Sequence, residues 1–357
     1  MSSNISENHN KTDFDFYKIY YLNLEKYYLN WYLPITIFVG IIGGIVCATF
    51  LIISKIFPKN VLIWMLSICI GDLMILLLDA LRMLLKVWIG FDIRDFNNTI
   101  CKMHNFFSNY FIYWSGYMQT CMSIQRLISI LNPLKARGMF TNKLVLSVWV
   151  SVSVLLTGPM VPYLLYWQVS EEKQGKDCSP VNKNLYTLIT VLDITIWGII
   201  PLLTMITSTI GISFVVFKST SEVGTFSSQS QSVKLVNNSS RRHAQVNNER
   251  AWQVTRLLIC MNILYFISNF PLLIYQIYLN AGGNKVDKSM PQQLHKTIYY
   301  TLRSICYLSS SWNWVFYCVG GHQFRTRALQ IIRRFNCFHK TDPQTETQTK
   351  TINLTSY

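Results

Sequence analysis

Charged residues are scarce in this chain. Only 14% of its 357 residues are Asp, Glu, Lys or Arg, whereas 50% are hydrophobic. An average soluble protein carries about 25% charged residues. This deficit, together with a positive mean hydropathy, argues against a soluble domain and favours a membrane protein.

Several chemical signatures are missing as well. The sequence has no Cys-x-x-Cys pair and no Cys/His spacing typical of a zinc site. No nucleophile–base or metal-ligand pattern indicates an enzyme. The N-terminal residues lack the short apolar core of a cleavable signal peptide. We therefore predict a membrane protein that is not an enzyme, with no cofactor except the sodium ion considered below.

Basic residues outnumber acidic ones, and the formal net charge is +15. Such an excess can indicate binding to nucleic acid. Here the basic residues stand mostly in short patches between apolar runs, which is the pattern of the positive-inside rule. We predict no nucleic-acid partner.

Apolar runs long enough to span a bilayer as helices dominate the sequence, since about 20 residues suffice. Their pattern predicts an all-α membrane protein, a bundle of seven transmembrane helices. The runs cover approximately 32–54, 61–85, 104–131, 144–167, 186–217, 255–279 and 297–319.

The distribution of Lys and Arg predicts the orientation. With the N-terminus outside, the internal segments hold 18 basic and 4 acidic residues, and the external segments hold 12 basic and 10 acidic residues. Because Lys and Arg prefer the cytosolic side, we expect an external N-terminus and a cytosolic C-terminus.

Outside the bundle of 32–319, four segments have a predicted character. Residues 1–31 form an extracellular tail, with glycosylation sequons at Asn4 and Asn10. Residues 218–250 are rich in Ser, Asn and Gln and predict a flexible third internal loop. Residues 320–338 can form an amphipathic eighth helix on the inner leaflet, and residues 339–357 a disordered cytosolic tail.

Modification and partner sites are expected on the cytosolic side. Cys337, just after the amphipathic segment, is a candidate for palmitoylation. Phosphorylation of the Ser- and Thr-rich segments 219–232 and 341–355 would create a site for the basic protein arrestin, unmodified segments being the alternative.

The nine cysteines support the same topology. Only Cys101 and Cys178 fall in external segments. A pair on the oxidising side is what one disulfide requires, although two free cysteines are the alternative. A disulfide would hold the second external loop against the top of the third helix.

A set of residues at characteristic spacings connects these features to a known family. Arg126 stands 25 residues after Cys101 and is followed by Pro133; the other matching residues are Asp72, Trp149, Cys178, Pro201, Pro271, Asn313 and Tyr317. In these positions the chain resembles a rhodopsin-like (class A) G-protein-coupled receptor over about 32–338. The run at 317–325 resembles the turn into helix eight of peptide receptors.

The sequence also departs from that family's pattern. Glycines at 43 and 44 stand where an asparagine is expected, and Gln125 replaces the acid before Arg126. Thr209 replaces a tyrosine. Asn269 occupies the position of the family's toggle tryptophan, and Trp314 replaces the proline of the seventh helix. These changes do not threaten the predicted fold, but they put the family's usual switching mechanism between resting and active states in doubt.

The resemblance implies a G-protein coupling and switch region that contains Gln125, Arg126, Tyr265, Pro271, Asn313 and Tyr317. An acidic neighbour would hold Arg126 in the resting state by a charge-assisted hydrogen bond, whereas Gln125 offers only a neutral one. We therefore expect raised basal signalling, which Gln125→Asp should lower.

Asp72 is an ionisable residue at membrane depth, which indicates function by default. The resemblance surrounds it with Ser115, Ser309, Ser310 and Asn313. These oxygens could hold a sodium ion, because hard cations prefer oxygen ligands. A hydrated carboxylate without a metal is the alternative.

The ligand site is expected between the outer halves of the helices. By position, Arg82 and Arg303 should both point into the bundle, and both are candidate ligand contacts. Asp79 and Arg82 can pair along one helix, whereas Arg303 has no obvious local partner and is the better candidate. Asp193, Tyr110 and Tyr275 complete the candidates, along with Ser108. At Ser108 amine receptors carry an aspartate, and at Tyr307 opsins carry the retinal lysine, so neither ligand is expected.

The sequence thus predicts a plasma-membrane receptor that binds an extracellular ligand and activates a heterotrimeric G protein by population shift. A neuropeptide ligand is favoured, and the resemblance points to the FMRFamide-like or thyrotropin-releasing-hormone-like group. A non-signalling member of the same family and a small-solute transporter are the alternatives, although the repeats typical of transporters are not visible.

Overall fold

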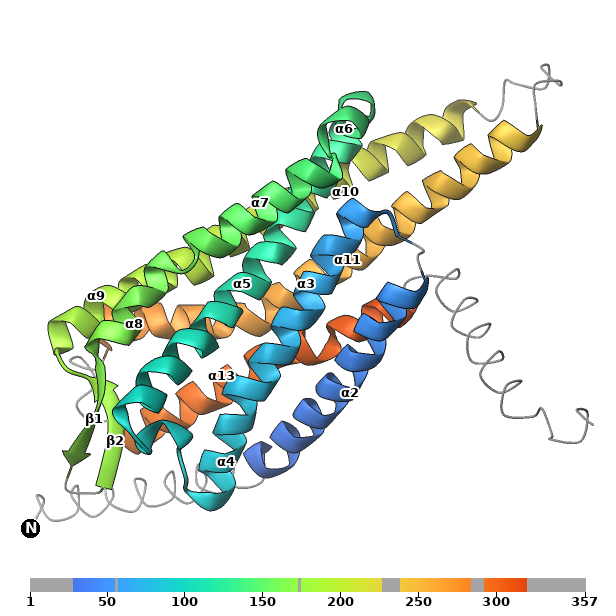
Figure 1. Cartoon of the computed structure of the whole chain (residues 1–357). Coiled ribbons are helices and arrows are strands. Elements are labelled where there is room, and N and C mark those ends of the chain that lie inside the picture. Colours follow the sequence, from blue (N-terminus) through green and yellow to red (C-terminus); the bar gives the residue numbers. More distant parts are fainter. Residues whose placement is uncertain (1–27, 55–56, 173–174, 227–237, 284–291, 320–357) are drawn as a thin grey trace, which may run out of the picture.

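A computed structural model describes residues 28–54, 57–172, 175–226, 238–283 and 292–319. Within these ranges the chain forms seven long helical rods that pack into one elongated bundle (Figure 1). Each predicted apolar run lies in one rod, so the prediction of an all-α bundle is confirmed.

Several of the rods consist of more than one helical element. In chain order they are α2 (Asn30–Ser54); α3 (Lys59–Ile75), η2 (Leu76–Ala80) and α4 (Leu81–Ile89); α5 (Asn98–Leu131); α7 (Asn142–Leu155), η4 (Gly158–Met160) and α8 (Val161–Tyr166); α9 (Lys183–Asp193), η5 (Ile194–Ile199) and α10 (Ile200–Phe226); α11 (Asn238–Tyr278) and η6 (Leu279–Gly283); and α13 (Gln292–Val319).

Local sequence signals explain where the rods begin. The Asn97 side chain accepts a hydrogen bond from the backbone N–H of Ile100, at 2.8 Å, and caps α5. Thr141 caps α7 in the same way through Leu144. A short helix, α6 (Pro133–Met139), begins with a proline, which suits the first turn because it lacks an N–H.

Five of the rods are long and apolar enough to cross a membrane by length and composition. The rods of α5 and α13 are comparably long but more polar. α5 packs against α3, α8 and α10, while α13 packs against α2, α3 and α11. Because these two rods contact protein on several sides, they can carry polar side chains that lipid would not accept.

The outer end of the bundle is closed by a β-hairpin. Strands β1 (Trp167–Glu172) and β2 (Gly175–Pro180) pair antiparallel, with Val169 opposite Cys178. A disulfide joins Cys178 to Cys101 near the start of α5, as predicted. The hairpin is therefore fixed to the central helix.

At the cytosolic end the helices extend further than expected. Residues 218–250 were predicted to form a flexible loop, but α10 continues to Phe226 and α11 begins at Asn238. Extending an existing helix costs little compared with starting one, and this segment contains no proline. That prediction was wrong for the two ends of the segment. Its centre, 227–237, lies outside the described residues.

Two departures from the family pattern contact each other in the structure. Gly43 on α2 faces the indole of Trp314 on α13, and a Cβ at Gly43 would lie 2.1–2.4 Å from the ring atoms. At Gly40, one turn earlier, a Cβ would lie 2.5 Å from the Leu76 side chain and 2.9 Å from the Cα of Ser311. Glycines at this face allow α2 and α13 to approach closely, and the bulk of Trp314 fills the space over Gly43.

Candidate functional site

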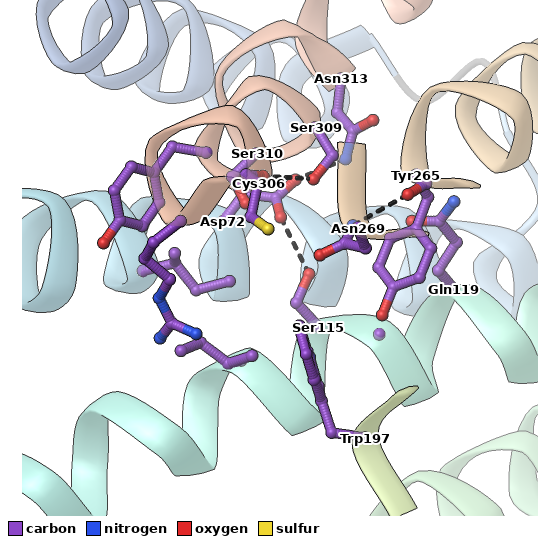
Figure 2. Close-up of a pocket in the computed structure, with 15 residues that line it drawn as sticks. Asp72, Ser115, Gln119, Trp197, Tyr265, Asn269, Cys306, Ser309, Ser310 and Asn313 are labelled. Carbon is purple, nitrogen blue, oxygen red and sulfur yellow. Dashed lines mark hydrogen bonds between the residues drawn. The ribbon is translucent and has the colours of Figure 1, made fainter. Parts of the chain in front are cut away.

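A small buried cavity of about 30 Å³ lies in the middle of the bundle. Figure 2 shows that its lining side chains come from α3, α5, η5, α11 and α13. Polar side chains, among them that of Asp72, line part of the cavity, and Arg303 lines another part. A volume of this size holds about two water molecules.

Asp72 is the acidic group in this cavity, and only 6% of its surface is exposed. One carboxylate oxygen accepts from the Ser115 hydroxyl at 2.9 Å, and the other accepts from the Asn313 amide at 2.8 Å. Ser309 and Ser310 also line the cavity. The residues predicted from the resemblance are therefore together in space.

The oxygen of the Asn313 amide is buried and has no hydrogen-bond partner within the described part of the chain. With the carboxylate of Asp72 and the nearby serine hydroxyls, it supplies oxygen donors that suit a hard monovalent cation or water. The described residues contain no group of three or more His, Cys, Asp or Glu that could hold a metal ion. Transition-metal chemistry is therefore not indicated within them.

Arg303 pairs with a residue that is distant in the sequence. Its Nε and Nη2 atoms donate to one oxygen of Asp79 at 2.9 and 2.7 Å. The Tyr307 hydroxyl donates to the same oxygen at 2.8 Å, and Arg82 lies 3.8 Å from the other. Asp79 lies in the π-helical segment η2, a kind of distortion that is frequent at functional sites.

Arg82 points instead toward the first outer loop, where Asp92 gathers three cations. Its carboxylate oxygen Oδ2 lies 2.9 Å from Arg82, 3.1 Å from Lys86 and 2.9 Å from Arg94. Arg94 also donates to Asn105 on α5. We call Arg82, Lys86, Asp92 and Arg94 the Asp92 cluster.

Burial by itself raises the pKa of Asp92. The hydrogen bond from Arg94 and the charges of Arg82 and Lys86 outweigh this effect and hold the pKa well below its usual range. Asp92 therefore remains ionised at physiological pH. This role could not be predicted, because the loop between α4 and α5 has no periodic pattern that would place its side chains.

Asp193, at the end of α9, has neutral hydrogen-bond partners. The hydroxyls of Tyr113 on α5 and Tyr163 on α8 donate to its two oxygens, the latter at 2.5 Å. No Lys or Arg among the described residues forms an ion pair with it within 4.0 Å. The two tyrosines were not predicted as site residues.

The other predicted ligand contacts lie in different surroundings. Tyr110 donates to the backbone oxygen of Ser153 on α7, at 3.1 Å, and therefore faces that helix. Tyr275 bonds to His295 at the outer end of α13, at 2.9 Å. Ser108 is buried. None of these three predicted residues lines the central cavity.

At the cytosolic end of α5, Gln125 bonds to a different helix. Its side-chain oxygen accepts from the indole N–H of Trp64 on α3, at 2.5 Å. Arg126 is half-buried and has no hydrogen bond or ion pair with any residue that the structure describes. Gln125 is thus used to join α5 to α3.

The remaining switch candidates lie on α11 and α13. Tyr265 lines the central cavity, and its hydroxyl approaches Gly116 so closely that a Cβ there would lie 3.0 Å away. Pro271 stands inside α11, which continues through it. The Tyr317 hydroxyl is buried and has no hydrogen-bond partner among the residues that the structure describes.

Some predictions fall outside the described residues. They are the glycosylation of Asn4 and Asn10, the palmitoylation of Cys337, the amphipathic helix at 320–338 and the tail at 339–357. They remain predictions.

Comparison with known families agrees with the fold. The family model described as "7 transmembrane receptor (rhodopsin family)" matches residues 29–317. The match covers most of the chain, so this protein belongs to the rhodopsin family of seven-transmembrane receptors, the class A G-protein-coupled receptors. A search of curated proteins found no match.

Membership in this family confirms several predictions. The protein is a multi-pass receptor of the plasma membrane that couples an extracellular ligand to a G protein, and it is not an enzyme.

Proposed function

We propose that the extracellular ligand of this receptor is a peptide, of the FMRFamide-like or a similar amidated class. The supporting observation is that the outer half of the bundle contains groups of opposite charge on different helices. Arg303 lies on α13 and Asp193 at the end of α9. A peptide combines a cation, amide or carboxylate acceptors and aromatic side chains, and so complements both groups.

Arg303 can contribute to binding even though it is paired. Its Nε and Nη2 atoms are used by Asp79, whereas Nη1 makes no hydrogen bond to any described residue. A guanidinium has five N–H donors and can serve two acceptors at once. An amide or carboxylate of the ligand would then share Arg303 with Asp79 or displace it.

Asp193 would serve the other end of such a ligand. Its two hydrogen bonds come from neutral hydroxyls, and no Lys or Arg among the described residues forms an ion pair with it within 4.0 Å. A buried carboxylate without a counter-ion is costly inside a membrane. A cationic ligand group would reduce that cost.

The test is a screen of amidated peptides on cells that express the full chain, with calcium and cAMP as readouts. For an active peptide, Arg303→Ala should lower potency about tenfold or more, because a charged hydrogen bond is lost. Asp79→Asn keeps Arg303 but removes the carboxylate charge that competes with the ligand for it. This variant should preserve or raise the potency of the peptide. Tyr186→Phe, on the exposed face of α9, serves as a control.

Two results would contradict the peptide proposal. One is silence with every peptide despite normal surface expression, which would favour a different ligand or a non-signalling receptor. The other is a response to peptides that neither Arg303→Ala nor Asp193→Asn changes.

Arrestin recruitment in the same cells would test the proposed phosphorylation of the cytosolic segments.

We also propose that a sodium ion can bind beside Asp72 and stabilise the resting receptor. Asp72, Ser115, Ser310 and Asn313 would hold it, and its charge would compensate that of the carboxylate. The thermal stability of the purified receptor in sodium is compared with that in N-methylglucamine. A sodium-dependent increase that disappears in Asp72→Asn is expected; equal stability in both salts would contradict the proposal.

A further inference from the structure

A second polar cluster lies between α5, α10 and α11, and it consists of uncharged side chains. The Asn262 amide on α11 donates to the Ser123 hydroxyl and to the Thr209 hydroxyl, both at 3.0 Å. Its oxygen accepts from the Gln119 amide at 3.0 Å. We call Gln119, Ser123, Thr209 and Asn262 the Asn262 cluster.

Asn262 thereby connects three helices through a single side chain. Gln119 and Ser123 stand four residues apart on one face of α5, and Thr209 lies on α10. In addition, Ser123 lies 3.3 Å from the Asn262 oxygen and bonds to the backbone oxygen of Gln119 at 2.9 Å. Both ends of the Asn262 amide are satisfied by partners on other helices.

Three of the four members of the cluster are buried, and Thr209 is half-buried. Asn262 is 4% exposed, Gln119 1% and Ser123 0%. In such surroundings a hydrogen bond is strong, and leaving one partner unpaired carries the full cost of desolvation. Any separation of α11 from α5 and α10 at this level has to break these bonds or admit water to replace them.

Charged contacts do not perform this task at the same end of the molecule. Arg126, two turns further along α5 than Gln119, has no partner among the described residues, and Gln125 bonds to α3. The Asn262 cluster is therefore the buried hydrogen-bonded connection from α5 to α11 in the described part of this region.

We propose that Asn262 is a positioning residue that holds α11 against α5 and α10 in the resting receptor, so that loss of its side-chain hydrogen bonds favours the state in which these helices separate. G-protein coupling requires access to the cytosolic side of the bundle. Asn262 then sets how often the receptor opens without ligand.

The cluster is also placed to respond to the central cavity. Gln119 lines that cavity and donates to Asn262, and Figure 2 shows it beside Tyr265 and Asn269 of α11. A rearrangement at the cavity can change the orientation of the Gln119 amide. Such a change would weaken the Asn262 cluster through direct contact.

The decisive variant is Asn262→Leu, which keeps the approximate size of the side chain and removes its hydrogen bonds. Asn280→Leu is the matched control, because the Asn280 amide bonds to a backbone oxygen of its own helical segment. Thr209→Val and Ser123→Ala each weaken the cluster from a partner helix. All variants are compared at equal surface expression.

Two measurements are needed, and neither requires a ligand. Basal activation is read with a panel of G-protein reporters in cells. Helix separation is read from spin labels at Lys143→Cys and Arg256→Cys, exposed positions on α7 and α11, with the exposed Cys260 replaced by Ser. Asn262→Leu should raise the population of the longer distance, and basal activation with it, about five- to tenfold. Thr209→Val should give a smaller increase.

Unchanged distances and unchanged basal activation in Asn262→Leu would overturn the proposal. An equal increase in Asn280→Leu would do the same, because it would show a general loosening of α11. If Asn262→Leu does not reach the surface, Thr209→Val and Ser123→Ala decide, and wild-type behaviour of both would refute the role of Asn262.

Discussion

The outer and cytosolic halves of this receptor are held together by different kinds of interaction. The outer half combines a disulfide with ion pairs, those of the Asp92 cluster and that of Asp79 with Arg303. From the middle of the bundle inward, no ion pair is found among the described residues. The contacts between helices there include close packing at Gly43, the hydrogen bonds of the Asp72 carboxylate, and neutral hydrogen bonds around Asn262 and Gln125.

The difference suits the tasks of the two ends. The ion pairs of Asp92 with three cations fix the first outer loop in a single arrangement. A fixed loop suits a surface that has to recognise a ligand. Neutral hydrogen bonds between helices contribute less each and can be exchanged for water or for other partners. An end that must open to a G protein is better served by contacts of this kind.

The largest effect is expected from Asp92→Ala. The substitution leaves three cations around a hub whose side chain is 1% exposed, and breaking such a buried arrangement costs about 3–5 kcal/mol. We expect a large drop in the melting temperature of the solubilised receptor. Asp177→Ala, a hairpin carboxylate without an ion pair among the described residues, should change it little. Equal drops would mean that Asp92 has no special role.

Gly43→Ala tests the packing of the inner half. The added methyl group would overlap the indole of Trp314, and overpacking of this kind costs about 1–3 kcal/mol. Trp314→Leu should restore much of the lost stability when the two changes are combined in a double-mutant cycle. Gly138→Ala, where a Cβ has open space, is the control. Additive effects would contradict the contact.

The charged outer half should also respond to pH. Because the folded state holds the pKa of Asp92 below its unfolded value of about 3.9, its stabilising contribution is present above that value and is lost as the pH falls further. Between pH 5 and pH 3 the wild type should lose about 1 kcal/mol more than Asp92→Asn, as measured by thermal unfolding. Parallel curves would exclude this linkage.

The smallest effect is expected at Gln125. Gln125→Asp places a carboxylate beside Arg126, which lacks a described partner, and should lower basal signalling about twofold, as for a weak ion pair. It also removes the acceptor for Trp64, so Trp64→Phe is measured in parallel. If Gln125→Asp leaves basal output unchanged, the expectation of a weakened resting state at Arg126 is wrong.

The fold could be predicted because it depends on features that are local in the sequence. Apolar runs of sufficient length define the helices, and the charges between them define the orientation. The disulfide followed from the location of Cys101 and Cys178. The extension of α10 and α11 into 218–250 could not be predicted from composition, because a polar segment can continue a helix that packing has already started.

The partners of the site residues were much harder to predict. Arg303 and Asp79 are 224 residues apart, and their pairing depends on how two distant helical rods pack against each other. The role of Asn262 could not be predicted, since a single uncharged amide in an apolar run does not by itself indicate a function. A useful clue was available in Gln119 and Ser123, which place polar groups four residues apart on one face of a predicted membrane helix.

The contact between Gly43 and Trp314 has a consequence for the history of the family. In this packing, a side chain at residue 43 would overlap the Trp314 indole, so the two departures depend on each other. In related receptors these positions should covary, with a bulky residue at one accompanied by glycine at the other. A lineage that regained the proline at 314 would be free to regain the asparagine of the first helix.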